Sequence, residues 1–304
     1  MTTSANTPAR IFLTGATGYI GSAIAHGLLE DGYEVLGLAR SDAAAETLRQ
    51  RGISVHCGDL TDLDSLAAGA QAAGGVIHTA FVHDFSRYEE INRIERRAVE
   101  AMAEALEGSG KTFVATSATT VLVPGQLGTE DDAAAPSSPG YVRAASEAAL
   151  PASQRGVRAS VVRLPPSVHG PGDTAFVPAL IAIARQTGIS GFVEEGENRW
   201  AAVHRLDAAR LFRLVFEKAE AGTAWHGVAE EGIPMRRIAE TIAEGLGIPA
   251  RSIPVSEAAD HFGWLAGFVQ IDNPASSALT RERIGWRPRE ADLLTDIRDS
   301  GYFS

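Results

Sequence analysis

The segment Thr14-Gly15-Ala16-Thr17-Gly18-Tyr19-Ile20-Gly21 carries the strongest chemical signal in the sequence. Its glycines follow the spacing G-x-x-G-x-x-G, between an apolar run at 10–14 and an apolar-periodic run at 18–29. Glycines let a backbone turn tightly and approach a pyrophosphate, whose charge is stabilised by the free N–H groups at a helix N-terminus. This order of strand, loop and helix predicts a dinucleotide-binding site. The expected contacts come from Thr14, Gly15, Thr17, Gly18, Tyr19, Ile20 and Gly21.

The end of the second apolar run, 34–39, indicates which dinucleotide is bound. NAD-dependent enzymes usually carry an acidic side chain there for the ribose diol, whereas NADP-dependent enzymes carry an arginine for the 2′-phosphate. Here the run ends Leu38-Ala39-Arg40-Ser41, without a carboxylate. Arg40 could bind the phosphate through its guanidinium and Ser41 through its hydroxyl, or Arg40 is a solvated loop residue. The sequence favours NADP(H) as the cofactor over NAD(H).

Short apolar runs alternate with longer amphipathic runs through the first half of the chain, which is typical of βαβ units and a parallel sheet. We expect strands at 10–14, 34–39, 53–57, 76–79, 112–116 and 159–164, and helices at 18–29, 42–51, 61–73, 88–106 and 142–154. Thr61 is the expected N-cap of the third helix. This order predicts an α/β fold with a doubly wound parallel sheet of the Rossmann type.

After Pro165, glycines and prolines are frequent, and short strands at 191–193 and 201–204 mix with helices at 177–185, 207–218 and 236–246. We therefore expect a dinucleotide-binding Rossmann domain over 1–165, its sheet completed in part by later segments. A smaller α/β lobe over 166–304 is expected to bind the substrate. Ligands of such sheets bind at the carboxyl ends of the strands, so the lobe is expected to close over that edge.

Composition and charge narrow the range of functions. The 304 residues are 45% hydrophobic and carry 38 acidic against 27 basic side chains, a net charge of −11. This balance disfavours nucleic acid or an anionic membrane as a partner, because phosphate binding needs clustered Lys and Arg. Cys57 is the single cysteine, so the sequence offers no internal disulfide and no metal-ligand spacing. No run reaches about 18 apolar residues and residues 1–10 are polar, so we expect a cytoplasmic protein.

Four segments beyond the glycine loop follow one another in a characteristic order: Gly58–Asp62, Val76–Ala80, Val162–Asp173 and Val203–Arg210. With the loop they resemble the T-G-x-x-G-x-x-G, G-D-L-x-D, V-x-H-x-A, V-R…V-x-G-P-G-D and V-H-x-x-D-x-A-R motifs of the extended short-chain dehydrogenase/reductases. The resemblance covers nearly the whole chain. It implies further cofactor contacts from Asp59, Leu60, Thr79 and Ala80. Asp59 either holds the adenine amino group or serves as an acid at a helix start.

The same resemblance implies a catalytic serine or threonine, a tyrosine, and a lysine four residues after the tyrosine that lowers the pKa of its hydroxyl. Ser117 stands at the serine position and Tyr141 follows 24 residues later, but Ala145 occupies the lysine position. Arg143, two residues from Tyr141, points to another helix face and is not expected to replace the lysine. The chain thus resembles an atypical subgroup. Tyr141 either donates a proton or packs at the helix start.

Histidines offer another proton source, because imidazole titrates near neutral pH. His83 follows the fourth strand and His169 the sixth, and each either acts chemically or bonds within the scaffold. We interpret Arg163 and Asp207 as a structural tie between the lobes. The aromatic residues of 262–268 either pack against the sheet or line a substrate pocket.

The sequence therefore predicts an NADPH-dependent oxidoreductase that reduces a small carbonyl or imine-like substrate, with catalytic candidates Ser117, Tyr141, His83 and His169. Two alternatives stay open: a catalytically silent NADP(H)-binding sensor or scaffold, and a redox-neutral epimerase or dehydratase with tightly held NAD. The sequence has no P-loop, H-E-x-x-H, C-x-x-C or G-x-S-x-G motif to support a kinase, zinc enzyme or hydrolase. By analogy with the family we expect a homodimer.

Overall fold

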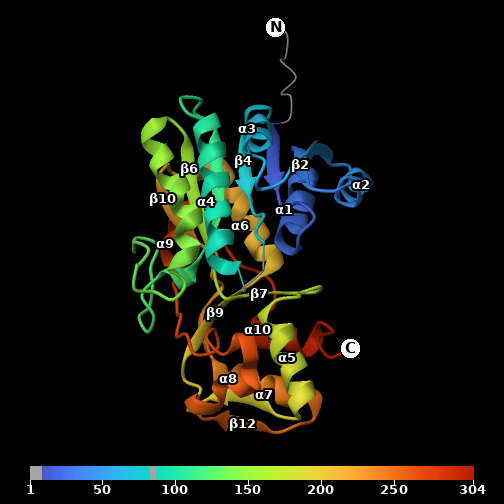
Figure 1. Ribbon diagram of the computed structural model, residues 1–304, viewed down its shortest axis with the longest axis vertical. Coiled ribbons are helices and arrows are strands. Elements are labelled where there is room, and N and C mark those ends of the chain that lie inside the picture. The colour runs from blue at the N-terminus through green and yellow to red at the C-terminus, as the bar shows by residue number, and fades with distance from the viewer. Residues whose placement is uncertain (1–8, 83–86) are drawn as a thin grey trace. The chain divides into compact units, whose positions relative to one another are not determined.

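Figure 1 shows a computed structural model of the chain, which describes residues 9–82 and 87–304. The first half alternates strands and helices as predicted. The elements are β1 (Arg10–Thr14), α1 (Tyr19–Glu30), β2 (Glu34–Ala39), α2 (Asp42–Gln50), β3 (Ser54–Cys57), α3 (Leu63–Gln71), β4 (Gly75–His78), α4 (Tyr88–Ala105), β5 (Thr112–Ala118) and β6 (Arg158–Leu164).

Seven strands form the main sheet, in the order β10-β6-β5-β4-β1-β2-β3. β1 pairs in parallel with both β2 and β4, and Phe12 of β1 lies opposite Leu36 and Val76. Strand β10 (Thr223–His226) completes the sheet from the second half of the chain. The strand order reverses between β1 and β4, and in such sheets this point is where a ligand binds. The predicted Rossmann-type doubly wound fold is confirmed.

Two details of the first half differ from the predictions. The N-cap of α3 is Asp62, whose carboxylate accepts the backbone N–H of Ser65 at 3.0 Å, so the prediction of Thr61 was wrong. The predicted helix at 142–154 forms a run of 3-10 turns, η3 (Tyr141–Arg155), with Pro151 inside it. Proline has no N–H to donate and crowds the carbonyl four residues earlier, which disfavours a regular α-helix there.

By their internal contacts, the residues divide into two compact units. Unit 1 comprises the described residues up to 117, with 142–162 and 209–224; unit 2 comprises 118–141, 163–208 and 225–304. The chain therefore passes between the units several times, whereas a single boundary near residue 165 was predicted. The loop after β5 belongs to unit 2, and most of α6 (Arg205–Lys218) belongs to unit 1.

Unit 2 has two small sheets and a helical core. Strands β7 (Ser167–His169), β9 (Arg199–His204) and β11 (Glu230–Pro234) form one sheet, and β8 (Ser190–Val193) pairs with β12 (Ala250–Ile253) in the other. The helices are α5 (Phe176–Thr187), α7 (Met235–Leu246), α8 (Ala258–Phe262), α9 (Ala278–Ile284) and α10 (Leu293–Asp299). Buried apolar side chains of α5 and α7 pack with Trp200 and Leu265. Within the described residues, no helix is both long and apolar enough to cross a membrane.

Candidate cofactor and catalytic site

The glycine loop between β1 and α1 leaves no room for side chains at two of its glycines. Gly15 has a φ of +74°, and a Cβ there would lie 2.7 Å from the backbone nitrogen of Ala80 and from the hydroxyl of Thr79. A Cβ at Gly21 would overlap the carbonyl oxygen of Gly15. Only glycine fits these two positions. The absence of side chains lets the loop pack closely against the end of β4.

The N-terminus of α1 can receive an anion. Gly18 is its N-cap and donates its N–H to the Gly15 carbonyl at 2.8 Å. No side chain of the described chain caps this end, and its first turn carries no acidic residue. The N–H groups at the start of α1 therefore remain available, and the helix dipole favours negative charge beside them. The loop fits the pyrophosphate of a dinucleotide.

The tip of β2 carries two hydrogen-bond donors. Ser41 is the N-cap of α2 and accepts the N–H of Ala44 at 3.2 Å, so its hydroxyl proton can serve another acceptor. Arg40 beside it is exposed. Asp59, on the loop after β3, accepts two bonds of 2.6 Å from Thr61, and these lower the pKa of its carboxyl group, with a further contribution from the charge of Arg40. The ionised Asp59 is thus engaged with Thr61 at the start of the next helix.

Thr14 fixes the backbone after β4, where Thr79 and Ala80 were predicted to contact the cofactor. Its hydroxyl oxygen accepts the N–H groups of Thr79 and Ala80, each at 3.2 Å, and lies 2.7 Å from Nδ1 of His78. Since the oxygen accepts twice from the backbone, its own proton points to His78 Nδ1. That leaves the proton of the imidazole ring on Nε2.

The buried carboxylate of Glu95 continues this network into the helices. His78 Nε2 lies 3.1 Å from Glu95 Oε1, and the Ser146 hydroxyl donates to the same oxygen at 2.7 Å. Burial raises the pKa of Glu95, but the hydrogen bonds from His78 and Ser146 and the positive charge of Arg143 outweigh it, so the pKa lies below its ordinary value. The network therefore links β1 and β4 to α4 and η3. Glu95 was not among the residues predicted from the sequence.

Ser117, the predicted catalytic serine, lies near the end of β5 with only 1% of its surface exposed. Its hydroxyl donates to Glu147 Oε1 at 2.9 Å. Glu147 lies on η3 and was not among the predicted catalytic residues, because the register of that helix against β5 cannot be derived from sequence alone. Ala145, at the position expected for lysine, is buried.

Arg143 provides a positive charge at the carboxyl ends of β4 and β5. Its guanidinium carbon lies 3.7 Å from the ring centroid of Phe81, just after β4, and Nη2 donates to the carbonyl of Thr116 at 3.3 Å. These contacts place a permanent cation at the ends of β4 and β5, where ligands of such a sheet bind. Its position on η3 relative to the strands, like that of Glu147, emerges only from the structure.

The remaining catalytic candidates are placed as follows. Tyr141 begins η3, is 41% exposed, and donates its N–H to the Ser138 carbonyl at 3.0 Å. Tyr141 and His169 belong to unit 2, whereas Ser117 belongs to unit 1. His83 lies outside the described residues.

Comparison with known proteins identifies the family. A profile of the NAD dependent epimerase/dehydratase family matches residues 11–226. The chain belongs to this family. An uncharacterised protein of Schizosaccharomyces pombe is 48% identical over 295 residues, 97% of this chain and 100% of that protein. The 2-alkyl-3-oxoalkanoate reductase of Stenotrophomonas maltophilia is 28% identical over 258 residues, which cover 79% of this chain and 76% of the reductase.

A solved structure of the dTDP-glucose 4,6-dehydratase DesIV from Streptomyces venezuelae, with NAD bound, has the same fold. It aligns with a TM-score of 0.76 at 18% identity and covers 96% of this chain and 95% of that one. The predicted resemblance to extended short-chain dehydrogenase/reductases is confirmed. The family is described as NAD dependent, which supports a nicotinamide dinucleotide as the cofactor.

In this member of the epimerase/dehydratase family, His169 lies in the core of unit 2. Its Nδ1 bonds to Asp296 Oδ2 at 2.8 Å, and its ring meets that of His204 edge-on at 5.4 Å. Its Nε2 has no hydrogen-bond partner in the described part of the chain. Burial lowers the pKa of His169, although the bond to Asp296 acts in the opposite direction. The ring is enclosed and neutral, which is the environment of a structural histidine.

Arg163 and Asp207 were interpreted as a tie between the lobes, but each bonds to residues within unit 2. Arg163 donates to the carbonyl of Asp132 at 2.8 Å. The carboxylate of Asp207 accepts the N–H groups of Arg289 at 2.8 Å and Glu290 at 3.0 Å. These bonds hold loops that lie far apart in the sequence.

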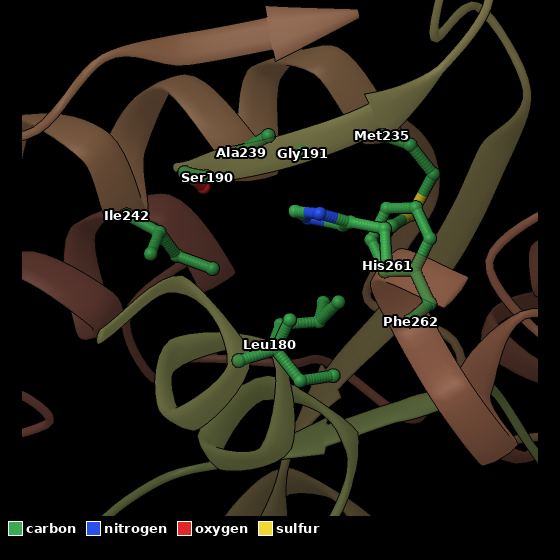
Figure 2. Close-up of a pocket in the computed structure, with 9 residues that line it drawn as sticks. Leu180, Ser190, Gly191, Met235, Ala239, Ile242, His261 and Phe262 are labelled. Carbon is green, nitrogen blue, oxygen red and sulfur yellow. The ribbon is translucent and has the colours of Figure 1, made fainter. Parts of the chain in front are cut away.

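A small cavity lies inside unit 2, between α5, β8, α7 and α8 (Figure 2). His261 points into it, and within the described residues its Nε2 has no hydrogen-bond partner. The cavity holds about 10 Å³, room for about one water molecule, so it is too small for a substrate. Phe262 lines it, whereas Trp264 is 52% exposed and contacts Phe268, with ring centroids 6.1 Å apart.

His169 and His261 predict that the protein loses stability as the pH falls below about 6.5. Burial lowers the folded-state pKa values of His169 and His261, so the unfolded chain binds protons that the folded chain does not. His261→Leu removes one of these titrations. Its thermal unfolding midpoint is expected to fall less than that of the wild type between about pH 7.5 and pH 5.

The control is His26→Leu, because His26 is exposed and pairs with Glu30 on the surface of α1. It is expected to keep the wild-type dependence of the midpoint on pH. If the unfolding midpoint of His261→Leu fell with pH as steeply as that of the wild type, His261 would not contribute to the loss of stability in acid.

Proposed function

We propose that this chain is an NADPH-dependent reductase of a small ketone or other carbonyl or imine-like substrate. The observation that carries the proposal is the pairing of an uncapped, glycine-lined N-terminus of α1 with Arg40 and Ser41 at the tip of β2. The first feature receives a pyrophosphate, and the second suits the 2′-phosphate of NADPH better than the free ribose diol of NADH.

The proposed reaction assigns distinct tasks to the side chains of the site. The bound cofactor supplies the hydride. The tight packing of Gly15 against Thr79 and Ala80 holds in position the loop that binds the dinucleotide. Arg143 stabilises negative charge that develops on the substrate oxygen at the ends of β4 and β5, since its guanidinium is held at this edge. Ser117, also at the end of β5, binds that oxygen.

Two further observations support a reductase. The S. maltophilia relative is named for reduction of a 3-oxoalkanoate, whose reacting group is a ketone. The tip of β2 lacks a carboxylate for the ribose diol of NAD, which weighs against a redox-neutral epimerase or dehydratase with tightly held NAD.

The test is oxidation of NADPH and of NADH with a panel of ketones, aldehydes and cyclic imines, followed by the absorbance of the reduced nicotinamide. Binding of both dinucleotides is titrated alongside. Turnover of a panel member with NADPH supports the proposal. Tight binding of NADPH without any turnover would instead favour a catalytically silent sensor, and tight retention of NAD would favour a redox-neutral enzyme.

Arg40→Glu is expected to reverse the cofactor preference. A charge-assisted hydrogen bond to phosphate contributes about 1.5–3 kcal/mol, so the Kd for NADPH should rise about 10- to 150-fold. Binding of NADH should stay equal or improve, because a carboxylate can bind the ribose diol. Titration of both dinucleotides measures the change.

Arg51→Glu reverses the charge of another exposed arginine at the far end of α2 and serves as the control. It is expected to leave both Kd values near those of the wild type. An equal loss of affinity in both variants would show that the overall electrostatic potential of the protein, and not a contact from Arg40, determines dinucleotide binding. That outcome would remove Arg40 from the phosphate site.

A further inference from the structure

We propose that Glu147 and Ser117 form the proton-transfer pair of this enzyme, in place of the missing tyrosine–lysine pair. The proposal rests on the proposed reductase function and names the group that moves the proton. Ser117 acts on the substrate, and Glu147 acts through Ser117 as a positioning and proton-relay residue.

The hydrogen bond between these two side chains carries the argument. A serine hydroxyl has one proton, and Ser117 directs it to Glu147 Oε1 at 2.9 Å. It cannot donate the same proton to a substrate oxygen at the same time. Ser117 can therefore donate to a carbonyl only if its hydroxyl turns to the substrate while a protonated Glu147 donates to the serine oxygen, so that one proton shifts from the carboxyl group to the serine. Such a shift makes the carboxyl group part of the chemistry.

The structure holds Ser117 at the reacting edge of the sheet. Thr116, its neighbour in β5, donates its hydroxyl proton to the carbonyl of His78 at 2.7 Å, which ties the end of β5 to the end of β4. The Ser117 side chain is buried, whereas Glu147 is partly exposed. A proton can therefore reach the carboxyl group from solvent, while Ser117 stays at the sheltered inner end of the relay.

Arg143 supplies charge at this edge but not a proton. A guanidinium stays protonated throughout the range in which proteins are stable, so it cannot exchange a proton as a lysine can. The proton must come from another group, and Glu147 is the carboxyl group that is bonded to Ser117. Glu95 on α4 also bonds to η3, through Ser146, and its other partner is His78 on β4.

The proton balance in the reducing direction is simple. The carbonyl carbon takes up the hydride of NADPH, and the electron pair of the C=O π bond moves to oxygen. That oxygen takes the proton of the Ser117 hydroxyl as the O–H bond breaks. Ser117 regains a proton from the carboxyl group of Glu147, and the carboxylate then takes up one proton from the solvent, the proton that the overall reduction consumes. In the oxidising direction each step reverses, and the carboxylate acts as the base.

The decisive variant is Glu147→Gln. The amide oxygen still accepts the bond from Ser117, but the amide cannot take up or release the proton. Turnover of a ketone substrate is expected to fall at least about 100-fold. The Kd for NADPH and the unfolding midpoint should stay close to those of the wild type. The loss should fall on kcat, with the KM for the ketone close to that of the wild type.

The matched control is Glu107→Gln, because Glu107 pairs with Arg155 at the far end of η3. It is expected to keep wild-type turnover. Ser117→Ala should lose about as much activity as Glu147→Gln, and the double variant no more than either, since the two residues act as one unit. Additive losses would overturn the proposal. So would full turnover in Glu147→Gln together with its loss in Tyr141→Phe.

A neutron crystal structure gives a readout that does not depend on activity. The deuteron of the Ser117 hydroxyl is expected on the line to Glu147 Oε1, and a deuteron that points elsewhere overturns the relay. If the wild type reduces no carbonyl compound, the proposed reductase function fails. If the wild type is active and Glu147→Gln is equally active, only the relay fails.

Discussion

Replacement of Gly21 by alanine is expected to abolish dinucleotide binding, whereas the same replacement at Gly27, in the same helix, is expected to stabilise the protein. A Cβ at Gly21 would overlap the carbonyl oxygen of Gly15, so either α1 or the loop must move. Overpacking of this kind costs about 1–3 kcal/mol, and the displaced loop no longer presents its N–H groups to the pyrophosphate. Equilibrium unfolding and NADPH titration measure the two effects.

Gly27 provides the control because a Cβ at this position has no neighbour within 4 Å. Alanine there reduces the conformational entropy of the unfolded chain, and the gain is about 0.5–1 kcal/mol with unchanged affinity for NADPH. If both variants bound NADPH as the wild type does, the glycine loop would not be the pyrophosphate site.

The Rossmann half of the fold could be predicted because its signals are local. An apolar run such as 10–14 is buried on both faces of a parallel sheet, and the helix that follows repeats its apolar residues at helical spacing. In unit 2 the strands β8 and β9 and the helices α5 and α7 were predicted, but several shorter elements were missed. Strands such as β12, with the sequence Ala-Arg-Ser-Ile, carry no periodic pattern, because pairing with β8 and not burial defines them.

The site was predictable only where sequence neighbours form it. The loop at 14–21 is one continuous segment, so its role follows from spacing. The partner of Ser117 lies thirty positions later on a helix whose regular turns Pro151 disrupts, and its register cannot be derived from spacing. For the same reason Arg143 was expected on an unproductive face. It in fact contacts Phe81 and Thr116 at the strand ends.

Glu95→Leu is expected to be the most destabilising single replacement in the helix layer of unit 1. It leaves the Nε2–H of His78 and the hydroxyl of Ser146 without their acceptor in a buried site. Each buried donor left without an acceptor costs about 1–3 kcal/mol, measured as the free energy of unfolding in denaturant. Glu100→Leu, at an exposed position of the same helix, should change stability by less than about 0.5 kcal/mol.

The isosteric variant Glu95→Gln separates the charge from the hydrogen bonds. The pKa of Glu95 lies below its ordinary value in the folded state, so its charge stabilises the protein above about pH 4.5, and that contribution is lost as the pH falls. The wild type should therefore be more stable than Glu95→Gln at neutral pH, and the difference should shrink in acid. A difference that is constant with pH would show that shape and hydrogen bonding alone matter. Because Thr14 connects the same network to the N–H groups of Thr79 and Ala80, the loss of charge should also weaken NADPH binding at neutral pH.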